Sequence, residues 1–63
     1  MPLLAVKTNV AIKDEKQLLD LLTDAIANGT GKPKGYVSVM LEGDKIMAFG
    51  GTLEPCAMIY LGK

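Results

Sequence analysis

The stretch DEKQLLDLLTDAIAN (Asp14–Asn28) predicts a helix and decides the fold, because strand-like segments lie on both sides of it. Asp14 is a good acceptor for a helix N-cap, and a glutamine follows it at the spacing of a capping box. The apolar residues of the stretch recur at helical spacing and form one stripe: Leu18, Leu21, Leu22, Ala25 and Ile26. Gly31 can end the helix in a left-handed turn, and Pro33 prevents its continuation. We therefore expect a helix from residue 15 to residue 28.

The segments around this helix predict four strands. Leu3–Val10 is short, apolar and β-branched towards its end, and Tyr36–Leu41 (YVSVML) has the same character. A helix between two strands implies a right-handed crossover and a parallel pair. Lys45–Phe49 is expected to form a short strand and Cys56–Leu61 (CAMIYL) a final one. The predicted fold class is α+β: a single βαβ-type unit with short additional strands, completed by oligomerisation.

Composition limits the classes of function. A chain of 63 residues with 49% apolar residues is expected to be one domain, residues 1–63, with a core too small to be very stable alone. There is one Cys and no His, so a metal site is not expected. Seven basic residues balance seven acidic ones, which argues against a nucleic-acid partner. No apolar run is long enough for a membrane span, and no signal peptide is evident, so we expect a cytoplasmic protein.

Three features could carry chemistry, and each also has a plain interpretation. Pro2 is either a tolerated first strand residue or, after removal of Met1, a free secondary amine. Lys32, in the loop GKPKGY, enters the second strand at a place where open α/β sheets usually bind ligands, although most lysines are simply solvated. The segment MAFGGTLEPCA (residues 47–57) lacks the pattern of a phosphate loop, and Cys56 within it is most simply a small buried side chain.

Taken together, these motifs resemble the tautomerase superfamily, and specifically the N-terminal half of the macrophage migration inhibitory factor family. The matching stretches are MP at the start, TNV at residues 8–10, TGKP at residues 30–33, Tyr36 with Val37, MAFGG at residues 47–51 and EPCA at residues 54–57. The resemblance covers almost the whole chain. The chain is also similar in size to a subunit of the 4-oxalocrotonate tautomerase group, whose members use one βαβ unit.

The resemblance implies a cofactor-independent keto–enol tautomerase, of the phenylpyruvate or dopachrome type, that acts on small α-keto or enol acids. The catalytic base and acid would be Pro2, exposed by removal of Met1. Lys32 would bind the substrate carboxylate, Tyr36 would line the pocket, and Leu61 would be a pocket position through the motif LGK. No cofactor or metal is required. The family also implies a homo-oligomer, either a trimer or a hexamer.

The sequence is also compatible with two other interpretations. Relatives include cytokine-like proteins that leave cells without a signal peptide, so the chain could be a secreted, non-catalytic binding protein with a receptor as its partner. It could also be a truncated fragment that folds only with its complement, because it has the length of half a family subunit.

Overall fold

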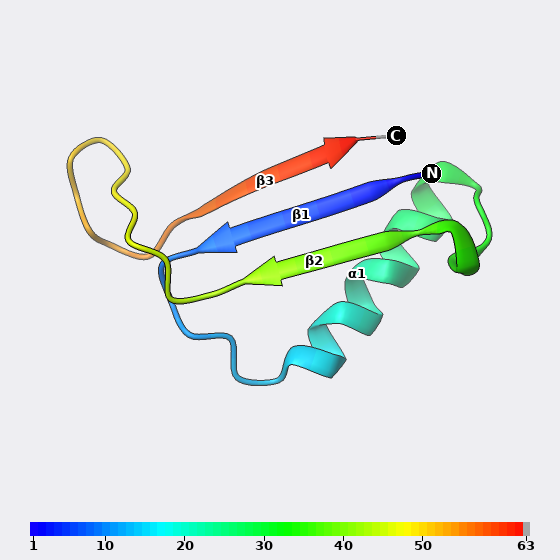
Figure 1. The fold of residues 1–63 in the computed structure, drawn as a ribbon, viewed down its shortest axis with the longest axis horizontal. Coiled ribbons are helices and arrows are strands. Elements are labelled where there is room, and N and C mark those ends of the chain that lie inside the picture. The colour runs from blue at the N-terminus through cyan, green and yellow to red at the C-terminus, as the bar shows by residue number, and fades with distance from the viewer. Residues whose placement is uncertain (63) are drawn as a thin grey trace.

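A computed structural model describes residues 1–62 and contains a three-stranded sheet with one long helix against it (Figure 1). The elements are β1 (Leu3–Thr8), α1 (Glu15–Thr30), a 3₁₀ turn (Lys34–Tyr36), β2 (Ser38–Glu42) and β3 (Ala57–Gly62). Lys63, the last residue of the LGK motif, lies outside the described part. Within residues 1–62, no helix combines the length and apolar character needed to cross a bilayer.

The sheet is mixed and has the strand order β2-β1-β3. β1 runs parallel to β2, with Leu4 opposite Val39, and antiparallel to β3, with Leu4 opposite Leu61. The predicted parallel pair and crossover helix are therefore confirmed. The central position of β1 explains why its residues include the most buried ones, such as Leu4 at 6% exposure.

Helix α1 begins after the predicted N-cap, Asp14, and ends at the predicted left-handed glycine, Gly31. The Asp14 carboxylate accepts a hydrogen bond from the Gln17 N–H at 3.2 Å, as predicted for the N-cap. Gly31 takes a left-handed conformation with φ of 72°, and its N–H donates to the Ala27 carbonyl at 2.9 Å. The helix is two residues longer than expected, because Gly29 and Thr30 continue it up to that glycine.

The helix covers β2 and leaves β3 uncovered, and this corrects the predicted apolar stripe. Ala27 is buried, although it is not part of the predicted stripe, whereas Leu21 (65% exposed) and Ala25, which are part of it, are exposed. The helix makes its extensive contacts with β2. The flank of α1 that carries Leu21 therefore faces open space beside β3.

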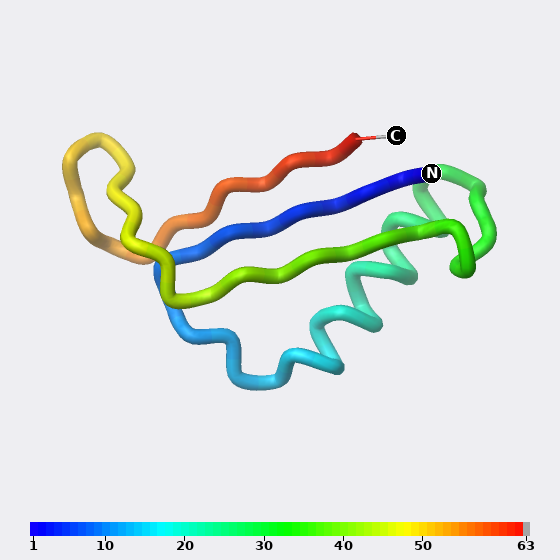
Figure 2. Tube along the Cα trace, viewed as in Figure 1, coloured from blue at the N-terminus to red at the C-terminus, as the bar shows by residue number. Residues whose placement is uncertain are grey.

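The predicted strand at Lys45–Phe49 is wrong. Residues 43–56 form an extended loop, which we call the arm, and it projects from the end of the sheet (Figure 2). Its only pairing in the described structure is an isolated bridge between Phe49 and Thr52, across two glycines with positive φ. A strand needs a neighbour for its backbone groups. The arm is bonded to the chain at its base, where the Asp44 and Lys45 N–H groups donate to the Val10 and Thr8 carbonyls, but Ile46 beyond them is fully exposed.

Candidate functional site

A pocket of about 510 Å³ lies where the start of β1, the end of α1 and the end of β3 meet. Its lining residues come from three separate segments of the chain: Met1, Pro2, Thr30, Lys32, Leu61 and Gly62. Three of the four residues that the resemblance assigned to a site, Pro2, Lys32 and Leu61, thus share one pocket. We call it the Pro2 pocket.

The sheet holds Pro2 in place. Its carbonyl oxygen accepts a hydrogen bond from the Ser38 N–H at 2.9 Å, which extends the β1–β2 ladder by one residue. Pro2 is buried, whereas Met1 is 76% exposed and its sulfur accepts a hydrogen bond from the Ser38 hydroxyl at 3.9 Å. Removal of the exposed residue would leave the nitrogen of a buried proline as the chain terminus, inside the pocket.

Lys32 follows the end of α1 and lines the same pocket. The left-handed turn at Gly31 redirects the chain, and the Lys32 N–H then donates to the Thr30 hydroxyl oxygen at 3.4 Å. The Thr30 hydroxyl itself donates to the Ile26 carbonyl at 2.7 Å. The Lys32 side chain forms no ion pair with an Asp or Glu among residues 1–62. Its positive charge is therefore available to an anionic ligand.

The next lysine is engaged elsewhere. The Lys34 ammonium lies 2.7 Å from an Asp24 carboxylate oxygen, and this hydrogen bond raises the pKa of Lys34 above its ordinary value. Likewise, the hydrogen bond from Lys16 lowers the pKa of the Asp20 carboxyl. Both pairs are exposed to solvent, where ion pairs contribute little to stability.

Tyr36 does not line the Pro2 pocket. It ends the 3₁₀ turn, its N–H donates to the Pro33 carbonyl at 2.9 Å, and its side chain is 63% exposed. Conversely, the sequence did not single out Thr30 or Gly62 as lining residues. Thr30 directly precedes the Gly-Lys-Pro motif, which was a usable signal, but Gly62 is placed by a register with β1 that no local pattern encodes.

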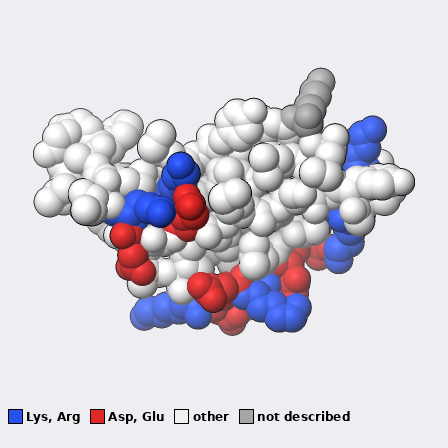
Figure 3. All heavy atoms as spheres, in the orientation of Figure 1, with Lys and Arg blue, Asp and Glu red and all other residues white. Residues whose placement is uncertain are grey.

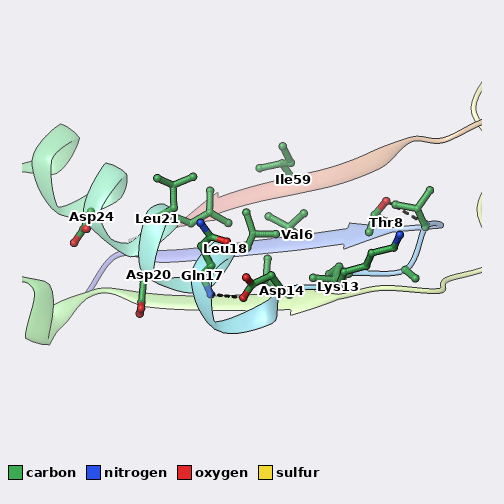
Figure 4. A pocket seen from close by; sticks show the side chains of 15 residues that line it. Val6, Thr8, Lys13, Asp14, Gln17, Leu18, Asp20, Leu21, Asp24 and Ile59 are labelled. Carbon is green, nitrogen blue, oxygen red and sulfur yellow. Dashed lines mark hydrogen bonds between the residues drawn. The ribbon is translucent and has the colours of Figure 1, made fainter.

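A larger hollow of about 790 Å³ lies between α1 and the sheet, and we call it the helix–sheet groove. Figure 4 shows Val6 and Ile59 on the sheet and Leu18 and Leu21 on the helix. Its rim carries three carboxylates, which come from Asp14, Asp20 and Asp24. Lys13 also lines this groove, and the Asp20 and Asp24 carboxylates are paired with Lys16 and Lys34. The groove is therefore mainly apolar and does not concentrate charge of one sign. Among residues 1–62, no three His, Cys, Asp or Glu side chains gather in a way that could hold a metal ion.

Comparison with solved structures defines the class. A crystal structure of a macrophage migration inhibitory factor homologue from Prochlorococcus marinus matches 90% of this chain and 51% of that chain, with 33% identity and a TM-score of 0.86. A macrophage migration inhibitory factor from Oncomelania hupensis matches 94% of this chain and 44% of that one, with 29% identity and a TM-score of 0.82. The fold is thus that of the tautomerase superfamily.

Sequence comparison then gives the family. The family model for macrophage migration inhibitory factor (MIF) matches residues 1–63. The chain is 40% identical over 62 residues to the factor from Meriones unguiculatus, a match that covers 97% of this chain and 54% of the relative. It is 34% identical over 62 residues to the Brugia malayi homologue, again over 54% of the relative. The chain belongs to the MIF family and spans about half the length of the curated relatives it matches.

Proposed function

We propose that this chain is a cofactor-independent keto–enol tautomerase for small α-keto or enol acids such as phenylpyruvate. Residues 1–63 would act as one tautomerase-like unit within a homo-oligomer. The observation that supports the proposal best is the shared pocket of a buried Pro2 and a Lys32 without an acidic partner among residues 1–62.

The chemistry requires a group that moves a proton between carbon and oxygen. In ketonisation, the enol O–H bond breaks and a C–H bond forms at the neighbouring carbon, so the catalyst accepts one proton and donates one. A free terminal amine has a pKa of about 7.7–8.0, and burial disfavours its charged form. An acid–base catalyst works best when its pKa lies near the working pH. The Pro2 amine, once Met1 is removed, would meet this requirement.

Lys32 supplies the binding charge in this proposal. Its ammonium would attract the substrate carboxylate as a point charge at the mouth of the pocket. Leu61 would contribute an apolar wall against the rest of the substrate. Tyr36 has no role in this proposal, because it lies outside the pocket lining.

Two measurements test the proposal. The intact mass of the purified chain shows whether Met1 has been removed, and the loss of ultraviolet absorbance by enol-phenylpyruvate, corrected for the buffer reaction, measures turnover. We expect Pro2→Gly to lower the rate about 10²-fold or more. Pro55→Gly is the matched control, because Pro55 lies in the exposed arm. A Pro2→Gly variant as fast as the unchanged protein, or full activity in a chain that retains Met1, would remove Pro2 from the mechanism.

The exposed apolar arm favours a second candidate, a non-catalytic binding protein. Three large apolar side chains of the arm are 75% exposed or more: Ile46, Phe49 and Leu53. Such side chains are more typical of a contact surface than of a solvated loop. A folded, Met1-free oligomer without turnover on any keto acid would favour this candidate over the tautomerase.

A further inference from the structure

Thr30 lies between the last turn of α1 and the lysine of the Pro2 pocket, and its hydroxyl is bonded to both. The hydroxyl donates to the Ile26 carbonyl at 2.7 Å, one turn back in the helix, and accepts from the Lys32 N–H at 3.4 Å. Thr30 and Lys32 both line the Pro2 pocket. Figure 3 shows basic side chains at the end of the molecule where β1 begins and α1 ends, whereas the acidic ones lie mainly along α1. One hydroxyl therefore connects the helix to the residue whose ammonium the proposed function uses.

The way in which α1 ends gives the hydroxyl this position. Gly31 closes the helix with a bond from its N–H to the Ala27 carbonyl at 2.9 Å, which is the αL type of helix end. In that type only the glycine N–H is bonded back to the helix, so the next N–H, that of Lys32, needs another acceptor. The Thr30 hydroxyl oxygen is that acceptor. On the other side, Pro33 keeps Lys32 out of the helical region, so the Lys32 backbone is set from both directions.

The hydroxyl of Thr30 has no proton to offer to a bound carboxylate. A hydroxyl has one donor and two acceptor lone pairs, and a carboxylate only accepts hydrogen bonds. The donor of Thr30 is already committed to the Ile26 carbonyl at 2.7 Å. Direct binding of a substrate carboxylate would break this bond to the helix. The hydrogen bonds of Thr30 therefore favour an action through Lys32 over a contact of its own with the ligand.

We propose that Thr30 is a positioning residue for Lys32: its hydroxyl holds the Lys32 backbone so that the ammonium is presented to the Pro2 pocket. A lysine is a point charge on a flexible stem, and a fixed backbone reduces the conformational freedom that binding must remove. Pro2 is held separately, through the Ser38 N–H that donates to its carbonyl at 2.9 Å. Loss of the Thr30 hydroxyl should therefore weaken ligand binding and leave the proton-transfer step unchanged. The role rests on the proposed function for the identity of the ligand, a small carboxylate.

Three variants test this role by steady-state kinetics on enol-phenylpyruvate. Thr30→Val removes the hydroxyl at nearly constant shape, and Thr30→Ser keeps it. Thr23→Val is the matched control, because the Thr23 hydroxyl makes the same kind of bond in the same helix, to the Leu19 carbonyl at 2.7 Å, but Thr23 is outside the pocket lining. Circular dichroism first establishes that each variant is folded.

We expect the effect to appear in KM and not in kcat. Because the bond to the Lys32 N–H is long, Thr30→Val should raise KM only about 2- to 5-fold. Thr30→Ser and Thr23→Val should keep the KM of the unchanged chain. An unaltered KM in Thr30→Val, or an equal rise in Thr23→Val, would overturn the proposal.

A double-mutant cycle separates positioning from direct contact. In a Lys32→Ala background, Thr30→Val should cause no further rise in KM, because the residue through which the hydroxyl acts is already gone. If the two effects add, Thr30 acts on the ligand independently of Lys32, and the proposed positioning role is wrong.

Binding of phenylacetate, a carboxylate without a keto group, separates this proposal from the proposed function. An NMR titration gives Kd for each variant without any turnover. If Thr30→Val weakens binding and Thr30→Ser does not, the positioning role stands even in a chain without tautomerase activity. If the chain is active through Pro2 but Kd is the same in Thr30→Val and the unchanged chain, the function stands and the role of Thr30 is wrong. Absence of binding by the unchanged chain would remove the carboxylate site and, with it, the role of Thr30.

Discussion

Asn9 fixes the arm to the end of β1. Its side-chain oxygen accepts a hydrogen bond from the Cys56 N–H at 3.0 Å, and its side-chain nitrogen donates to the carbonyls of Leu53 at 3.3 Å and Glu54 at 3.0 Å. The neighbouring Thr8 hydroxyl donates to the Cys56 carbonyl at 2.7 Å. One amide therefore satisfies three backbone groups and sets the point at which the chain enters β3.

Replacing Asn9 with Ala should destabilise the fold. The change removes three hydrogen bonds and leaves the N–H of the half-buried Cys56 without its acceptor, which costs about 1–2 kcal/mol of unfolding free energy. Urea unfolding followed by circular dichroism measures the loss. Asn28→Ala, on the exposed face of α1, is the control and should not lower stability. Equal stability of the two variants would show that the Asn9 contacts contribute nothing.

Lys32 and Lys34 lie in the same loop, so replacing each of them tests whether Lys32 in particular binds the substrate carboxylate. If Lys32 binds the substrate carboxylate, Lys32→Ala loses a charge-assisted contact of about 1.5–3 kcal/mol, or roughly 10- to 100-fold in KM, with a smaller effect on kcat. Lys34→Ala should change KM little, because the Lys34 ammonium is bound to Asp24. Steady-state kinetics on enol-phenylpyruvate compares them. If KM rises equally in both variants, the loss of positive charge from the loop explains the effect, and Lys32 has no specific role in binding the carboxylate.

At the scale of elements, replacing either of two glycines at the end of α1 with alanine should change the unfolding free energy, but in opposite directions. Gly29 lies inside the helix with open space around it, so Gly29→Ala should raise the unfolding free energy by about 0.5–1 kcal/mol. Gly31 has φ of 72°, where a side chain is strained, so Gly31→Ala should lower it by about 1–2 kcal/mol. Urea midpoints measure both. A stabilising Gly31→Ala would mean that the helix end does not need its left-handed turn.

The helix was predictable because its signals are local, and the strands were predictable only in part. Asp14 and Gly31 mark the ends of α1 within the sequence itself. Lys45–Phe49 has the composition of a strand but no neighbour in this chain, so the prediction failed where it depended on a distant partner. β2 begins at Ser38, two residues later than predicted, because Lys34–Tyr36 form a 3₁₀ turn after Pro33.

The residues of the candidate site also fall into two groups: those that local motifs predict and those that depend on contacts between distant segments. Pro2 and Lys32 were found through short motifs, and the structure brings them to one pocket with Leu61. Thr30 could have been added, since it adjoins the lysine motif. Gly62 reaches the pocket only through the antiparallel register that sets Leu3 opposite it, a pairing of residues far apart in the chain. No pattern within a single segment specifies such a register.

At the scale of the whole molecule, the chain buries little of its apolar material. In the described residues, the buried apolar side chains are Pro2, Leu4 and Ala27. Conformational entropy opposes folding in proportion to length, so a core of this size gives a marginal fold. Association within the proposed homo-oligomer would supply the remaining stabilisation.

The thermal midpoint of the chain should therefore depend on its concentration. When folding is coupled to dimer formation, a hundredfold rise in protein concentration adds about 2.7 kcal/mol per dimer in favour of the folded state. With an unfolding entropy of about 2.1 cal/mol/K per residue, this corresponds to a rise in Tm of roughly 10 °C. Circular dichroism in cells of different path length measures Tm across that range at equal signal. A Tm independent of concentration would mean that the chain is stable enough to fold without association.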